Sequence, residues 1–416
     1  MFPFLRRFLS VVGLLAISQA LNALSLALIP VLLDPSWADS FALGMQVGTA
    51  AYGGVVLGVV YNVAIGRPGF AHWRRAAVLA GVFSLVLGAV TIFATMALSQ
   101  RGGSLPVEGM LVVAIFAVGG AGLAVGGTGG VREACLGNPA RLTAVNLFPA
   151  LALLIGLLLA GFLSLSPMLT AGMWTIVAIG QIPWIWRGRR EAAAADLGPG
   201  AGRAGSSERS SDAAVGRHSI SLAVGVIAST VIPTLYITAL TQLPAGSTAV
   251  AFVVVRIATS IVGIGVNSLL LVRYNWESGS RDIRGVVTAL TGSSAVVLAA
   301  SLTVELWMPG IAALSALIAA WIILLVAAAV SLRETNARRL TTSITVKVII
   351  DVSSSAAGCV LLFAHPSLGS YFGLLVLSQA VTMLVTSAFF RFRLASALSA
   401  VGVLVAVWWA LQPALI

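Results

Sequence analysis

The stretch AVAFVVVRIATSIVGIGVN (residues 249–267) is apolar over membrane-spanning length except for one arginine, Arg256. A helix that crosses a bilayer needs about 20 consecutive, mostly apolar residues. The chain has 416 residues, of which 59% are hydrophobic and 9% are charged, whereas about a quarter of the residues of a soluble domain are charged. The sequence therefore predicts an all-α polytopic membrane protein. We expect thirteen spans, at residues 8–33, 39–65, 75–98, 108–128, 142–164, 168–186, 218–242, 247–272, 285–306, 310–332, 342–363, 369–390 and 394–411.

The basic residues are concentrated in every second gap between these spans. Of the 24 lysines and arginines, 21 lie in alternate gaps, one (Arg101) lies in the other set, and two (Arg256 and Lys347) lie inside spans. Cytoplasmic loops retain Arg and Lys, so the N-terminus is predicted inside and, after thirteen spans, the C-terminus outside. The net charge of +11 then faces anionic lipid, and no compact basic domain for nucleic-acid binding is evident.

One long segment lacks the composition of a membrane-spanning helix. Residues 187–217 are small, polar and mixed in charge, and such a stretch cannot bury enough apolar surface to order itself. We interpret it as a flexible cytoplasmic linker between two lobes of six helices each, residues 1–186 and 218–393, followed by an additional helix in 394–416.

The two predicted lobes show weak internal similarity. With an offset of 210 residues, Thr49 corresponds to Thr259, Gly53 to Gly263, and Gln46 to Arg256. Repeats of shared orientation are an architecture of transporters, in which the binding site lies between the halves near the membrane midplane.

The sequence shows no constellation typical of an enzyme. Its three histidines are scattered, without a Cys, Asp or His at metal-ligand spacing. No phosphate-binding loop motif is present. The glycine run at 118–130 is instead interpreted as permitting close helix packing or a break in the helix. We therefore expect no enzyme activity, no metal and no cofactor, leaving energy coupling to an H+ or Na+ gradient as an option.

Arg256 is the first candidate site residue, because a charge at this depth in the bilayer costs at least about 2.5–3.5 kcal/mol. Such a residue faces the bundle interior, a partner or a wet cavity. The guanidinium fork suits phosphate or pyrophosphate, so one interpretation is a substrate-binding group. The other is an interhelical ion pair, with Asp351 as the partner.

Lys347 and Asp351 are four residues apart in TTSITVKVIIDVSSS (residues 341–355), so they share a helix face and are able to pair. Asp351 is the acidic residue deepest inside a span, which makes it a candidate for coupling to protons or sodium. Mutual neutralisation with Lys347 is the alternative. Amides recur in the first spans of each lobe and are candidates to line a hydrophilic cavity or to cross-link helices: Gln19, Asn22, Gln46, Asn62 and Asn267.

Three segments carry a resemblance to a known family. The segments SLAVGVIASTVIPTLYITALTQLPAGSTAVAFVVVRIATSIVGIGVNSLLL, VKVIIDVSSSAAGCVLLFAHPSLGSYFGLLVLSQAVTMLVTSAFFRFR and VREACLGNPARLTAVNLFPALALLIGLLL are similar to parts of the multidrug/oligosaccharidyl-lipid/polysaccharide exporter superfamily, polysaccharide-flippase branch. The resemblance is one of hydropathy layout and loose pattern over about 390 residues, without an invariant motif. It implies a V-shaped bundle of two six-helix lobes that flips lipid-linked sugars by alternating access. It also implies a pyrophosphate-binding role for Arg256, by its position, and extends that role to Lys347.

The expected function is translocation of a polyprenyl-pyrophosphate-linked oligosaccharide from the inner to the outer leaflet of a bacterial cytoplasmic membrane. The expected partners are this glycan lipid, membrane lipids, and polymerases or glycosyltransferases of envelope-polysaccharide synthesis. Two alternatives stay open: a cation-coupled exporter of small molecules or drugs from the same superfamily, and a non-transporting membrane scaffold of an envelope-glycan complex. The sequence leaves open the glycan, the lipid length, the coupling ion and the oligomeric state.

Overall fold

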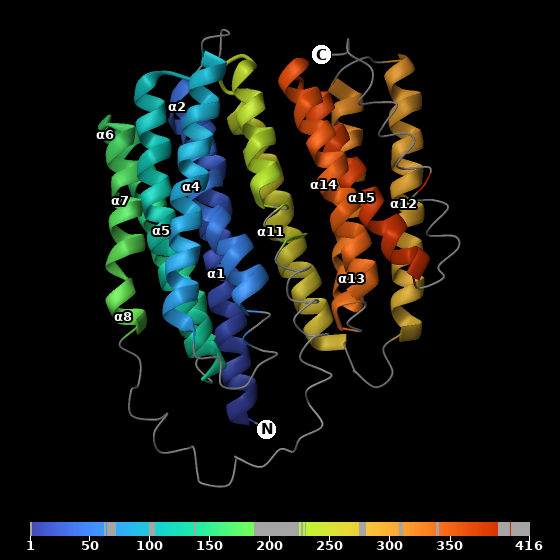
Figure 1. Cartoon of the computed structure of the whole chain (residues 1–416), viewed down its shortest axis with the longest axis horizontal. Coiled ribbons are helices and arrows are strands. Elements are labelled where there is room, and N and C mark those ends of the chain that lie inside the picture. Colours follow the sequence, from blue (N-terminus) through green and yellow to red (C-terminus); the bar gives the residue numbers. More distant parts are fainter. Residues whose placement is uncertain are drawn as a thin grey trace. The chain divides into compact units, whose positions relative to one another are not determined.

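The computed structural model describes residues 2–61, 64, 72–99, 105–136, 139–186, 224–225, 228, 230–273, 280–307, 311–337, 341–389 and 400. These residues form helices joined by short turns, with no strand among them (Figure 1). The chain divides into two compact units. Unit 1 comprises Met1–Ala97 and Leu105–Thr234, and unit 2 comprises Leu98–Ser104 and Leu235–Ile416.

Unit 1 contains the helices of the first half of the chain. They are α1 (Phe2–Leu32), α2 (Pro35–Ala51), which continues as the π-helix η1 (Tyr52–Val60), α4 (Trp73–Ser99), α5 (Val107–Cys135), α6 (Pro139–Leu163), α7 (Pro167–Gly180) and α8 (Ile182–Trp186). Helix α5 packs against α2, η1, α6, α7 and α8, and α1 packs against α6. Helix α5 is therefore the centre of this unit.

The glycine run at 118–130 explains why α5 occupies the centre. The helix is continuous through the run, so of the two alternatives the break is absent and the close-packing interpretation holds. A Cβ on Gly120 would lie 2.6 Å from the Gly48 carbonyl oxygen of α2, and one on Gly119 would lie 2.5 Å from the Trp174 ring of α7. Hydrogen atoms at these positions let neighbouring helices approach to backbone contact, as small residues do in membrane bundles.

Acidic and basic residues lie at opposite ends of three helices of unit 1, α2, α5 and α6. A Cβ on Gly109 of α5 would lie 2.2 Å from Ser40 Oγ of α2, so the first turns of these helices share one end, which also carries Asp34, Asp39 and Glu108. At the opposite end, Arg141 of α6 pairs with Glu133 near the end of α5, and Arg132 lies beside them in sequence. Apart from Glu133, the described charges of these three helices thus divide into an acidic end and a basic end, the polarity that the alternate-gap pattern predicts.

Unit 2 contains the helices of the second half. A helix through residues 230–239 crosses the boundary between the units after Thr234, and its part in unit 2 runs into η2 (Leu240–Gln242). The helices α11 (Ser247–Arg273), α12 (Ser280–Trp307), α13 (Ile311–Ala337), α14 (Thr341–Ala364) and α15 (Leu368–Phe389) follow. Helix α13 packs against α11, α12, α14 and α15. Its Trp321 is buried and lies 6.3 Å, between ring centroids, from Phe372 of α15. Here α13 is the central helix.

The helices show that the protein is a multi-pass α-helical membrane protein. Seven described helices are long and apolar enough to cross a bilayer, and each coincides with a predicted span. They are Pro35–Val60, Trp73–Ser99, Val107–Cys135, Arg141–Leu163, Pro167–Trp186, Thr345–Ala364 and Leu368–Ala388.

Four further predicted spans coincide with helices of membrane length, namely α1, α11, α12 and α13. Their described apolar portions are shorter. The predicted linker (187–217), the predicted thirteenth span (394–411) except residue 400, and most of the predicted seventh span before residue 230 lie outside the described residues.

Candidate functional site

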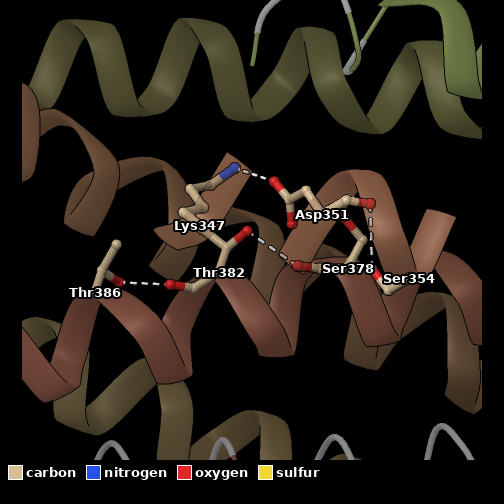
Figure 2. Close-up of polar contacts among 6 residues, drawn as sticks. All are labelled: Lys347, Asp351, Ser354, Ser378, Thr382 and Thr386. Carbon is tan, nitrogen blue, oxygen red and sulfur yellow. Dashed lines mark hydrogen bonds and ion pairs between the residues drawn. The ribbon is translucent and has the colours of Figure 1, made fainter. Parts of the chain in front are cut away.

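A half-buried ion pair of unit 2 lies on α14. Lys347 Nζ donates to Asp351 Oδ2, and the two side chains are 16% and 18% exposed (Figure 2). Because the residues are one helical turn apart, the pairing expected from their spacing forms within α14 itself. Two charges held this far from water each need a partner, since desolvating an unpaired ion costs several kcal/mol.

The pair leaves one carboxylate oxygen over. Asp351 Oδ1 is buried and, among the residues that the structure describes, has no hydrogen-bond partner. One turn further along, the Ser354 hydroxyl donates to the Asp351 main-chain carbonyl at 3.2 Å, so it does not serve the side chain. A buried carboxylate oxygen without a donor keeps an open acceptor position, which calls for an explanation in a folded protein.

Helix α15 brings a row of hydroxyls to this pair. Ser378, Thr382 and Thr386 recur every four residues, and the close-up places Thr382 next to Lys347 (Figure 2). The Thr382 hydroxyl donates to the Ser378 carbonyl at 3.0 Å, and that of Thr386 donates to the Thr382 carbonyl at 2.7 Å. The hydroxyl oxygens keep lone pairs after donating, so this face of α15 offers acceptors beside a buried ammonium group.

Two tyrosines continue the polar cluster. The Tyr236 hydroxyl donates to the Ser355 carbonyl of α14 at 3.2 Å and lies within electrostatic range of Asp351. The Tyr236 ring meets the Tyr371 ring of α15 edge to face, with centroids 6.5 Å apart. Gly358 makes the approach possible, because a Cβ there would lie 2.4 Å from the Tyr236 hydroxyl.

Arg256 joins the cluster from α11. Its Cζ lies 5.3 Å from the ring centroid of Phe252, one turn earlier on the same helix, and its charge interacts with the buried Tyr371. The side chain is half-buried. The alternative pairing of Arg256 with Asp351 is not observed in the described part of the chain, because the carboxylate pairs with Lys347.

Arg256, Tyr371, Tyr236, Asp351 and Lys347 thus form one cluster across four helical segments of unit 2. Sequence reasoning had selected its three charged members and missed both tyrosines. The chain has five tyrosines, and two of them lie here, but their position opposite α14 depends on helix packing that no sequence spacing reveals.

None of the amide candidates whose side chains the structure describes lies in unit 2. Gln46 of α2 belongs to unit 1, where its Nε2 lies 3.3 Å from Thr234 Oγ1, a contact that cross-links two helices. Gln19 and Asn22 lie half-buried on α1. Asn267 lies on α11 with its side chain outside the described part of the structure, and Asn62 falls outside the described residues altogether.

The described residues include no group of three or more His, Cys, Asp or Glu able to hold a metal ion. Comparisons with protein-family models, with curated proteins and with solved structures find no match to this chain. Its function therefore has to be argued from the site and the helix arrangement.

Proposed function

We propose that this protein is a membrane transporter that translocates an anionic, lipid-linked substrate, with a polyprenyl-pyrophosphate-linked oligosaccharide as the substrate class. The observation that carries the proposal is Arg256, a half-buried arginine within an apolar helix, with the Phe252 ring centroid 5.3 Å from its Cζ. A charge so placed is functional by default in a membrane protein. Its guanidinium presents several donors in a fork that fits phosphate oxygens.

The order of helix contacts supports a transporter built from a repeated unit. In unit 1, α2 contacts α5, α5 contacts α7, and α6 contacts α7. In unit 2, α11 contacts α13, α13 contacts α15, and α14 contacts α15.

The remaining contacts follow the same order. In unit 1, helix α1 packs on α6. The matching contact in unit 2 is the hydrogen bond from Tyr236 to α14. In unit 1, α4 contacts α5 through the Ser84 hydroxyl, which donates to the Ala117 carbonyl at 3.1 Å. The matching contact in unit 2 is the packing of α12 on α13. Duplicated bundles of shared orientation are an architecture of secondary transporters, and this order agrees with the two six-helix lobes proposed from the sequence.

In the proposed mechanism Arg256 binds the pyrophosphate while the lipid tail stays in the bilayer, and alternating access moves the head group to the other leaflet. Lys347, which pairs with Asp351, adds a second cation. The family resemblance of the sequence is consistent with this role, which we propose on the strength of Arg256 and the polar cluster around it.

A reconstituted flipping assay tests the proposal. Purified protein in proteoliposomes is supplied with a polyprenyl-pyrophosphate-linked oligosaccharide, and the appearance of the glycan in the opposite leaflet is followed with a lectin or glycosidase. Hydrogen bonds to a charged group are worth about 1.5–3 kcal/mol each, so Arg256→Gln is expected to reduce translocation roughly 10- to 100-fold. Arg256→Lys should retain part of it, since Lys keeps the charge without the fork.

The control is Arg75→Gln, which removes an exposed cation at the start of α4 and should leave flipping unchanged. If Arg256→Gln translocates the glycan lipid at the rate of the control, the proposed function is wrong.

A second candidate function is favoured by the unpartnered Oδ1 of Asp351. In that case the protein is a cation-coupled exporter, and the carboxylate binds and releases H+ or Na+ as substrate moves. Asp351→Asn removes the titrating group while keeping its size. Coupled export predicts that this variant no longer responds to an imposed gradient. A flippase that runs without coupling would keep its rate in Asp351→Asn, with or without a gradient.

A further inference from the structure

A second cluster of charged and aromatic side chains lies at the basic end of unit 1, where α5, α6 and α8 meet. It consists of Arg132, Arg141, Trp184 and Trp186, which we call the Arg–Trp cluster. The Cζ of Arg141 lies 5.5 Å from the ring centroid of Trp184, and the Cζ of Arg132 lies 6.0 Å from that of Trp186. Both cations are thus held against indole rings at a distance typical of cation–π contact.

The cluster carries excess positive charge. Arg141 Nη1 donates to Glu133 Oε2 at 3.2 Å and lies 3.4 Å from the Ile185 carbonyl oxygen, so these contacts use one of its three guanidinium nitrogens. The Arg141 side chain is 23% exposed, whereas that of Glu133 is 5% exposed. Among the described residues, no carboxylate pairs with Arg132. The described part of the cluster therefore holds two guanidinium groups and one carboxylate, and the partly exposed Arg141 keeps N–H groups that these contacts do not use.

An apolar stripe begins about two helical turns along α6 from Arg141. Phe148, Leu151 and Ile155 lie at spacings of three and four residues on α6, and their side chains are 43%, 41% and 42% exposed. The Phe148 ring meets the Trp184 ring edge to face at 6.0 Å, and Trp184 is 46% exposed. The stripe and the cations are thus joined through one exposed indole.

We propose that the Arg–Trp cluster is a binding site for an anionic membrane phospholipid. The lipid phosphate accepts hydrogen bonds from the accessible N–H groups of Arg141, and an acyl chain lies along Phe148, Leu151 and Ile155. Trp184 sits where the two parts of the lipid join, the level of the bilayer at which indole is favoured. The site is separate from the polar cluster of unit 2 and does not depend on what the protein transports.

Native mass spectrometry of the purified full-length chain, titrated with phosphatidylglycerol or phosphatidylcholine, tests the proposal. One basic residue near an anionic lipid surface contributes roughly a fivefold preference, so Arg141→Gln should weaken phosphatidylglycerol binding about fivefold and leave phosphatidylcholine unaffected. Trp184→Leu should weaken it about two- to fivefold, the worth of an exposed cation–π contact. Glu133→Gln should strengthen it about fivefold, because Arg141 is no longer neutralised.

The matched control is again Arg75→Gln, since Arg75 is exposed and no ring stacks on it in the described chain. This variant should bind both lipids as the wild type does.

Equal binding of the two lipids by the wild type would overturn the proposal. Arg141 also contacts both α5 and α8, so lipid binding by Arg141→Gln is interpreted only if this variant folds. If Glu133→Gln fails to strengthen binding and Trp184→Leu fails to weaken it, the proposal is overturned whatever Arg141→Gln does. Displacement of the lipid by inorganic phosphate alone would overturn it too, because the site would then recognise a free anion.

Discussion

The replacement Gly120→Ala tests the packing of unit 1 most directly. A Cβ at this position would lie 2.6 Å from the Gly48 carbonyl oxygen and 2.7 Å from Gly48 Cα, whereas ordinary contact begins at 3.4 Å. Both neighbours are backbone atoms of α2, which cannot turn aside as a side chain does. Helices α2 and α5 would have to separate by several tenths of an ångström, which loosens the contact between the Phe41 and Phe116 rings, now 5.3 Å apart.

The cost follows from two opposing terms. Adding a methyl group to a tightly packed core costs typically about 1–3 kcal/mol, while replacing glycine by alanine within a helix recovers up to about 1 kcal/mol. We expect the free energy of unfolding to fall by about 1–2 kcal/mol. A suitable measurement is unfolding in mixed micelles as the mole fraction of SDS rises, followed by tryptophan fluorescence.

The chain supplies its own control. Gly172 lies inside α7, and a Cβ there would meet nothing within 4 Å. Gly172→Ala should therefore be neutral or slightly stabilising, since only the helix-propensity term remains. Equal stability of the Gly120 and Gly172 variants would refute the reasoning, because it would mean that α2 and α5 do not touch through their backbones at Gly120.

Three further predictions concern the ion pair, the tyrosine cluster and the topology. Lys347→Met should lower the free energy of unfolding by about 3–5 kcal/mol, because it leaves the Asp351 carboxylate without its partner, whereas Lys347→Met combined with Asp351→Leu should be close to neutral. Unfolding in SDS compares the two variants, and equal losses of stability would contradict the pairing. Tyr236→Phe removes the hydrogen bond to the Ser355 carbonyl and should cost about 0.6–1.7 kcal/mol, the range for such bonds within membranes, with an unchanged stability counting against the contact. In a Cys359→Ser background, exposed Cys135, at the basic end, should react with a membrane-impermeant maleimide in inverted vesicles and not in right-side-out ones; the reverse result would overturn the predicted orientation.

Much of the helix layout could be predicted from the sequence. The expected span at 75–98 compares with Trp73–Ser99 and that at 369–390 with Leu368–Phe389, because apolar length is a local property that a bilayer reads directly. The expected span at 108–128 ended too early. Helix α5 continues to Cys135, since its last glycines pack against α6 and α8 instead of ending the helix.

The candidate site could be predicted only in part. Lys347 and Asp351 lie one turn apart, and any helix would bring them together. Arg256 was selected by its depth alone, and its neighbours could not be predicted. Asp351 was the partner suggested by the ion-pair alternative, but in the structure that carboxylate pairs with Lys347 and the Phe252 ring lies beside Arg256. The Arg–Trp cluster could not be predicted, because no sequence spacing shows that Arg132 and Arg141 lie over the rings of Trp186 and Trp184.

The sequence by itself thus determined that this is a multi-pass helical membrane protein, where most of its helices lie, and which charges break the rule of alternate gaps. These properties depend on transfer of each segment into lipid, which residue type and chain length govern. Only the tertiary structure decided which helix is central in each unit, which charges find partners, and which tyrosines stand beside them. Such contacts join residues more than a hundred positions apart, as between Tyr236 and Ser355. Helices in lipid associate through close packing and polar contacts, and no hydrophobic pattern along the chain encodes their partners.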